Sequence, residues 1–184
     1  LGTQQNIDEA GGQLLVARYR LARHVEARKA GDMESAREFA AQAALAARQA
    51  TEISTWSDAA WLALAMSLEA AGNEDEALVA YEQAYRRNPE NPRTARNYSS
   101  LLLRSGDASA RALGVLKTTY ELMPADGAIR EAWLLAEEEA GNFKDVMQVR
   151  NNGLRTERAN RRNILQLAKL LATLEPRREL FIDE

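Results

Sequence analysis

Glycine turns recur along this chain of 184 residues at a nearly constant spacing. Gly31, Gly72, Gly106 and Gly141 are separated by 41, 34 and 35 residues, and each is followed by Asp or Asn. A glycine just past the end of a helix tolerates a positive φ, and a following Asp or Asn caps the next helix. The spacing therefore predicts helix–turn–helix hairpins that repeat about every 35 residues.

The composition favours helices throughout the chain. Aromatic residues make up 6% of the sequence and glycine plus proline only 14 of 184 residues, whereas Ala, Leu, Glu and Arg are abundant. These abundant residues have high helix propensity. Pro89 and Pro124 are 35 residues apart, and each lies between the end of one hairpin and the start of the next. We therefore expect an all-α fold.

The hairpin over residues 58–91 carries the most specific pattern. Its residues, in chain order, are Trp61, Leu64, Ala65, Leu68, Ala77, Tyr81, Ala84 and Pro89. This pattern resembles the tetratricopeptide repeat, with Ala65, Leu68 and Tyr81 in place of the usual glycine, tyrosine and phenylalanine. The large residues of the first helix form an apolar stripe at i, i+3 and i+7, and the small Ala65 and Ala77 allow the two helices to approach closely.

The resemblance extends, with weaker patterns, over residues 14–174. It implies an all-α, right-handed α-solenoid of about four hairpins plus a closing helix near 161–174, which would cover the apolar face of the last hairpin. On this basis the chain is expected to have a flexible N-terminal segment over 1–13, one solenoid domain over 14–174, and a C-terminal tail over 175–184.

The first hairpin departs from the pattern. The repeat spacing puts Arg20, Arg23, His24 and Ala27 at the packing positions of its first helix. Seven surplus residues, all compatible with a helix, precede Trp56. We therefore expect its second helix to run about two turns longer than usual, at 3.6 residues per turn.

A concave groove is the functional feature that the resemblance implies. In tetratricopeptide arrays the first helix of each hairpin lines a groove that holds an extended or helical peptide, so we expect a non-catalytic scaffold or adaptor that binds another protein or peptide. The candidate groove residues, which lie off the packing stripe, are Leu62, Met66, Arg93, Arg96, Asn97, Ser100, Arg104, Glu131 and Leu135.

The chemistry of the candidate groove residues suggests an acidic ligand segment. Arg93, Arg96 and Arg104 can hold carboxylates by forked hydrogen bonds. Met66 and Leu62 supply an adaptable apolar pocket, and Asn97 is a candidate for binding a peptide backbone. An equally weighted alternative is that the arginines pair across the groove with acidic residues of the chain itself, namely Glu69, Glu131 or Glu138.

Self-association is the alternative function, in which repeats of different copies stack into a homo-oligomer. The alanine-rich stretch 40–50 is either a self-association face or, as we favour, a closely packed seam between hairpins. The apolar residues Leu180, Phe181 and Ile182 in the tail are expected to dock on the closing helix or in a neighbouring groove.

Several classes of function are disfavoured by what the sequence lacks. It contains no cysteine and a single histidine, His24, which we expect to be a structural residue, exposed or partly buried. No phosphate-binding loop or metal-binding motif is present. We therefore expect no enzyme, no cofactor and no metal. Because no run of about 18 apolar residues exists, we also expect no membrane span.

The charge distribution raises the question of nucleic-acid binding. Residues 144–178 contain nine basic and three acidic side chains, but the whole chain has a formal net charge of −3 and few aromatics. A solvated basic cap is therefore favoured over an RNA surface. The cytoplasm is the favoured compartment, and export stays open because the chain begins at Leu1 and a targeting peptide could have preceded it.

Overall fold

The chain folds into α-helices joined by short turns, as predicted. The computed structural model describes residues 2–105, 109–156, 165, 166 and 168–170. The helices are α1 (Gly2–Lys29), α2 (Met33–Ile53), α3 (Asp58–Ala71), α4 (Glu74–Arg87), α5 (Pro92–Arg104), α6 (Ser109–Leu122), α7 (Gly127–Glu139) and α8 (Phe143–Thr156). Residues 165, 166 and 168–170 are helical as well. The helices pair into four hairpins, which agrees with the predicted repeat.

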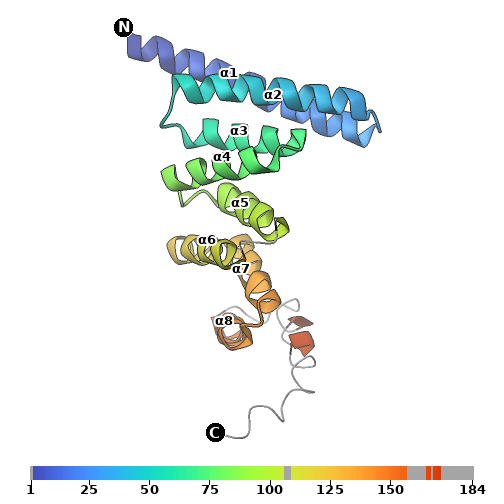
Figure 1. Cartoon of the computed structure of the whole chain (residues 1–184). Coiled ribbons are helices and arrows are strands. Elements are labelled where there is room, and N and C mark those ends of the chain that lie inside the picture. Colours follow the sequence, from blue (N-terminus) through green and yellow to red (C-terminus); the bar gives the residue numbers. More distant parts are fainter. Residues whose placement is uncertain (1, 106–108, 157–164, 167, 171–184) are drawn as a thin grey trace, which may run out of the picture. The chain divides into compact units, whose positions relative to one another are not determined.

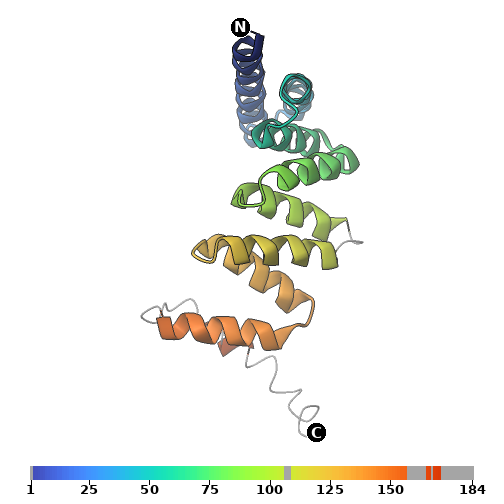
Figure 2. The same cartoon turned by 90° about the vertical axis from the view of Figure 1, so that its left-hand side faces the viewer.

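The chain divides into two compact units, Leu1–Trp133 and Leu134–Glu184, and the division falls within α7. The single domain expected over 14–174 therefore crosses a boundary between units. In the first unit the hairpins α1–α2, α3–α4 and α5–α6 follow one another, and each helix from α1 to α6 packs on its neighbours along the chain (Figures 1 and 2). α1 also packs on α3. This arrangement is an all-α solenoid of stacked hairpins.

The glycine turns have the predicted backbone conformation. Gly31, Gly72 and Gly141 have φ values of 80°, 86° and 83°, and Gly106 lies outside the described residues. In this left-handed region a side chain would clash with the backbone, so glycine is favoured. The local sequence thus determines where these three hairpins turn.

Side chains cap the N-termini of α2 and α3, and the cap of α2 is the expected one. The carboxylate of Asp32 accepts a hydrogen bond from the Ser35 backbone N–H at 3.0 Å, as expected for α2. Ser57 caps α3 in the same way. Asn73 was expected to cap α4, but its side chain makes no capping bond. The first turn of α4 instead carries three acidic residues, whose negative charges stabilise the helix by interacting with the positive end of its dipole.

The first hairpin differs from the prediction at its start. α1 is helical from Gly2, whereas residues 1–13 were expected to be flexible. Ala10 is buried, because α2 lies alongside α1, and no proline interrupts this segment. α2 extends to Ile53, so the prediction of extra helical turns is confirmed.

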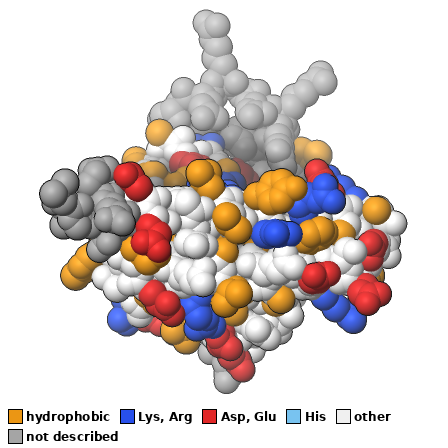
Figure 3. Space-filling model, turned by 90° about the horizontal axis from the view of Figure 1, so that it is seen from above, with side chains coloured by type: hydrophobic (Ala, Val, Ile, Leu, Met, Phe, Trp, Pro, Cys, Tyr) orange, Lys and Arg blue, Asp and Glu red, His pale blue; other side chains and the backbone are white. Residues whose placement is uncertain are grey.

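The packing register of α1 also differs from the repeat spacing. Ala17 and His24 are buried, whereas Arg23 is exposed. The guanidinium carbons of Arg20 and Arg23 lie 5.9 and 5.4 Å from the centroid of the Phe39 ring on α2. Both arginines therefore cover an aromatic ring instead of forming an inward stripe. Figure 3 looks onto this end of the molecule and shows hydrophobic side chains bordered by charged ones.

The alanine-rich stretch of α2 is a packed seam. Its buried members are Ala36, Ala40, Ala43, Ala46, Ala47 and Ala50. α2 packs on α1 and on α3, and small side chains permit close contact on more than one side of the helix. The structure therefore agrees with the favoured interpretation of residues 40–50.

The repeat signature occupies the core of the second hairpin. The buried signature residues are Leu64, Ala65, Leu68, Ala77, Tyr81 and Ala84. Trp61 is partly buried, and its indole N–H donates to the Thr55 carbonyl at 2.9 Å. Pro89 lies partly buried in the turn before α5. The ring of Tyr81 stacks on that of Tyr98 in α5 with 6.4 Å between centroids, which joins this hairpin to the next.

In the second unit, the side chain of Arg150 is buried and hydrogen-bonded. Arg150 donates to Glu138 Oε1 from Nε at 3.0 Å and from Nη2 at 2.8 Å, and its Nη1 donates to Gln166 Oε1 at 2.9 Å. Of the predicted closing helix only residues 165, 166 and 168–170 are described, and Leu170 among them is buried. The apolar tail at 180–182 lies outside the described residues.

Candidate partner-binding groove

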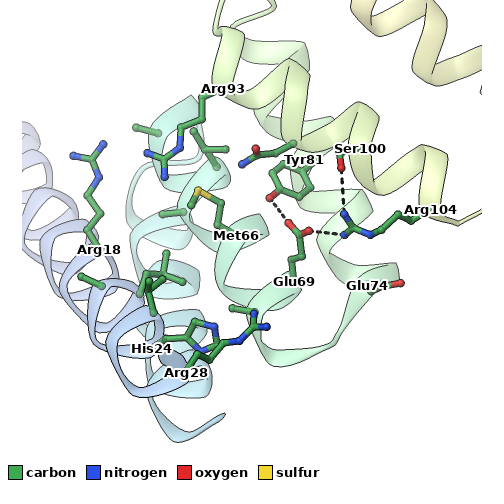
Figure 4. A pocket seen from close by; sticks show the side chains of 18 residues that line it. Arg18, His24, Arg28, Met66, Glu69, Glu74, Tyr81, Arg93, Ser100 and Arg104 are labelled. Carbon is green, nitrogen blue, oxygen red and sulfur yellow. Dashed lines mark hydrogen bonds and ion pairs between the residues drawn. The ribbon is translucent and has the colours of Figure 1, made fainter. Parts of the chain in front are cut away.

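A groove of about 780 Å³ lies in the first unit, and helices α1, α3, α4 and α5 line it. The first helices of three successive hairpins, α1, α3 and α5, contribute most of its residues, as expected. Figure 4 shows Arg18 on the α1 side and Arg93 extending from α5 toward it, with Met66 of α3 near the Arg93 guanidinium. The groove therefore has two basic walls and an apolar floor.

Six of the nine predicted groove residues line this groove: Leu62, Met66, Arg93, Asn97, Ser100 and Arg104. The four on α5 are spaced i, i+4, i+7 and i+11, so they share one face of the helix. The two on α3 are spaced i, i+4.

The other three predicted residues lie elsewhere. Arg96 is exposed and does not line the groove, and its Nε donates to the Pro92 carbonyl at 3.2 Å. Glu131 is partly buried on α7 and does not line the groove either. Leu135 belongs to the second unit, where it lines a separate cavity of about 430 Å³.

Glu69 organises one end of the groove. Its Oε1 accepts from Arg104 Nη2 at 2.5 Å, and its Oε2 accepts from the Tyr81 hydroxyl at 2.6 Å. Arg104 Nη1 also donates to Ser100 Oγ at 3.2 Å. The alternative in which arginines pair with acidic residues of the chain therefore holds for Arg104. Its charge is offset by Glu69, and its guanidinium is held in place.

Arg93, unlike Arg104, is not paired with an acidic residue of the described part of the chain. It is exposed and, among the described residues, it forms no ion pair. The same is true of Arg18 and Arg28 on α1, which also line the groove. Three arginines from two walls are thus available to an acidic ligand.

Comparisons with known proteins agree with the fold. A profile of the tetratricopeptide repeat family matches residues 58–101, which span α3, α4 and most of α5. These residues therefore match a tetratricopeptide repeat. A solved structure described as the functional characterization of Pseudomonas aeruginosa pilF superposes with a TM-score of 0.60 at 20% sequence identity, covering 90% of this chain and 72% of that one. This likeness shows a shared fold. No curated protein matches this chain in sequence.

Tetratricopeptide repeats bind other proteins or peptides and are generally non-catalytic, so the chain has the general character of a protein-interaction scaffold. Within the described residues no group of three or more His, Cys, Asp or Glu side chains could hold a metal ion. No described helix is both long and apolar enough to cross a bilayer.

Two buried polar side chains of the first unit, His24 and Tyr81, form hydrogen bonds within the chain. His24 is buried, which is deeper than expected, and its Nδ1 lies 2.9 Å from the Ala36 carbonyl oxygen, a distance at which Nδ1–H donates. This bond joins α1 to α2. Burial raises the pKa of Tyr81 strongly, and the hydrogen bond and charge of Glu69 raise it further. Tyr81 therefore remains a protonated donor to Glu69.

The α1 wall of the groove was missed from the sequence. Arg18, Leu21, Val25 and Arg28 line it, although the repeat spacing pointed to other positions of this helix. The signal that identifies them is a second stripe on α1, with spacings of three or four residues, next to the stripe that packs inward.

Proposed function

We propose that the chain is a non-catalytic adaptor that binds an acidic segment of a partner protein in the groove between α1 and α5. One observation carries the proposal: Arg18 of α1 and Arg93 of α5 both line the groove, and neither forms an ion pair within the described part of the chain. Guanidinium groups bind carboxylates through paired hydrogen bonds, which gives both affinity and orientation.

The charge balance of the groove supports an acidic ligand. Arg104 and Glu69 offset each other, so Arg18, Arg28 and Arg93 remain against Glu74 alone among the charged acidic residues that line it. Leu62 and Met66 form an apolar floor beneath them. A partner segment with acidic and apolar side chains would satisfy both kinds of surface.

The test uses peptides of about 15 residues, long enough for about four helical turns, selected from a random library displayed on phage. Binding of the selected peptides, labelled with fluorescein, is measured by fluorescence anisotropy. Arg93→Glu is compared with the matched control Arg37→Glu, since Arg37 is an exposed arginine of α2 that lies outside the groove. We expect Arg93→Glu to weaken binding at least about tenfold and Arg37→Glu less than about twofold.

The proposal is wrong if the two variants weaken binding equally, or if the library yields no specific binder. Salt supplies a second readout, because affinity that depends on exposed charge pairs falls as ionic strength rises. Affinity independent of salt would contradict a role for the arginines.

The alternative, assembly by repeat stacking, makes a different prediction. It requires a free hairpin face that accepts another repeat, whereas Arg20 and Arg23 cover Phe39 on the α1–α2 hairpin. Light scattering over a range of concentrations separates the two functions. A monomeric mass throughout supports the adaptor, and a mass that rises to a fixed multiple supports assembly.

A further inference from the structure

α1 carries a largely apolar stripe next to the one that packs inward. Leu15, Arg18, Ala22 and Val25 follow one another at spacings of three, four and three residues, which is the spacing of a helix-pairing seam. Leu15 is 67% exposed and Val25 is 48% exposed. Large apolar side chains exposed in such a row mark a surface suited to contact with another helix.

This stripe continues into the groove. Arg18, Ala22 and Val25 belong both to the stripe and to the lining of the groove, so the stripe and the α1 wall are one surface. Tyr19, 60% exposed and four residues after Leu15, widens the apolar area beyond the groove. An occupant that fills the groove and covers this stripe must run alongside α1.

The floor of the groove, on α3, and its wall on α1 carry apolar side chains at the same spacing. Leu21 and Val25 on α1, and Leu62 and Met66 on α3, are both pairs at i, i+4, which form two short rows of apolar side chains along adjacent helices. Side chains at i, i+3, i+4 and i+7 of a third helix fit between such rows. The floor therefore has the form of a helix-packing surface.

An extended ligand fits this surface less well. Its backbone N–H and C=O groups would need partners from the groove, because buried backbone groups must be hydrogen-bonded. Asn97 was the residue expected for this role, but it lies beside the Tyr81 hydroxyl and interacts with it. A helix satisfies its own backbone and presents only side chains.

The positions of the groove arginines predict where the bound segment carries acidic side chains. On α1, Arg18 and Arg28 flank the apolar groove residues Leu21, Ala22 and Val25, and they are ten residues apart, which is about 15 Å along a helix. Arg93 faces the Arg18 end from α5 (Figure 4). Acidic side chains at the two ends of about three helical turns match these positions.

Resting on the function proposed above, we infer that the partner segment is an amphipathic α-helix of about three turns, apolar in its middle and acidic at both ends, which packs along α1 over Leu21, Ala22 and Val25.

The test uses the phage-selected peptides and a matched pair of variants. Val25→Ser removes an apolar side chain from the seam, whereas Val79→Ser makes the same change at an exposed valine of α4 that lies outside the groove. We expect Val25→Ser to weaken binding about tenfold and Val79→Ser less than about twofold. We also expect the helical circular dichroism of the peptide to increase on binding, and a proline in its centre to abolish binding.

Each outcome decides the inference separately from the proposed function. Peptides that tolerate a central proline and Val25→Ser, yet lose binding with Arg93→Glu, overturn the helix and leave the acidic-segment adaptor intact. Loss of binding with Val25→Ser but not with Arg93→Glu supports apolar packing of the peptide on α1 and contradicts recognition of acidic side chains by Arg93. If light scattering shows a dimer that Val25→Ser converts to a monomer, a second copy occupies the seam and the inference is wrong.

Discussion

We expect the hydrogen bond between Glu69 of α3 and Tyr81 of α4 to stabilise the packing of these two helices. In a Glu69→Ala variant the buried Tyr81 hydroxyl loses its acceptor at 2.6 Å, which costs about 1–3 kcal/mol. The ion pair with Arg104 is lost as well, but Arg104 is 48% exposed and such pairs contribute about 0.2–1 kcal/mol. Asn97 beside the hydroxyl offers a weaker partner, so the lower part of the range applies.

The expected loss is therefore about 2 kcal/mol, which corresponds to about 4–8 °C in Tm for a chain of this size. Urea denaturation followed by circular dichroism measures it for Glu69→Ala, Tyr81→Phe and the double variant. In the double variant no buried hydroxyl is left without an acceptor, so its loss should be about 1 kcal/mol smaller than the sum of the two single losses.

Additive losses, within about 0.3 kcal/mol, would refute this reasoning, because they would mean that the carboxylate and the hydroxyl do not interact. Arg104→Ala is the control for the ion pair. It should lose less than about 1 kcal/mol, and a larger loss would assign the stabilisation to the charge pair instead.

Three other perturbations test the packing, a turn and a cap. Leu101→Ala, at a fully buried site, should lower the free energy of unfolding by about 2–5 kcal/mol in urea denaturation. Leu103→Ala, at an exposed site nearby, should lower it by less than about 1 kcal/mol, and equal losses would contradict the placement of Leu101 in the core. Gly72→Ala, at a φ of 86°, should lose about 1–2 kcal/mol, and an unchanged stability would exclude the left-handed turn. The Ser35 hydrogen bonds lower the pKa of Asp32 below its ordinary value of 3.8, so its stabilisation is present above that value and is lost as the pH falls through the lowered pKa. Asp32→Ala should therefore lower Tm at pH 7 but not after the carboxyl is protonated, and a difference that persists in acid would contradict the cap.

Local signals predicted the hairpins because their turns depend on short-range chemistry. Gly31, Gly72 and Gly141 each adopt a conformation that glycine accommodates without strain, so their spacing was enough to locate the turns. The residues around Trp61 formed a dense pattern and occupy the core of one hairpin. The N-terminal start of α1 was not predicted, because the burial of residues such as Ala10 results from tertiary packing, which the repeat spacing does not show.

The groove could be predicted only in part. Leu62, Met66 and the α5 residues followed from the off-stripe positions of well-patterned helices. The α1 wall could not be found in the same way, because α1 has two stripes with spacings of three or four residues. Ala17 is small and His24 is polar, so residue type did not reveal which stripe is buried. The pairing of Arg104 depends on the distance to Glu69 across two hairpins, which sequence spacing does not give.

The most direct measurement is a crystal structure of the full chain bound to one of the phage-selected peptides. Electron density for a helical peptide between α1 and α5, above Met66, with a carboxylate at Arg18 or Arg93, is the predicted result. Peptide density on any surface away from Met66 would contradict binding in this groove.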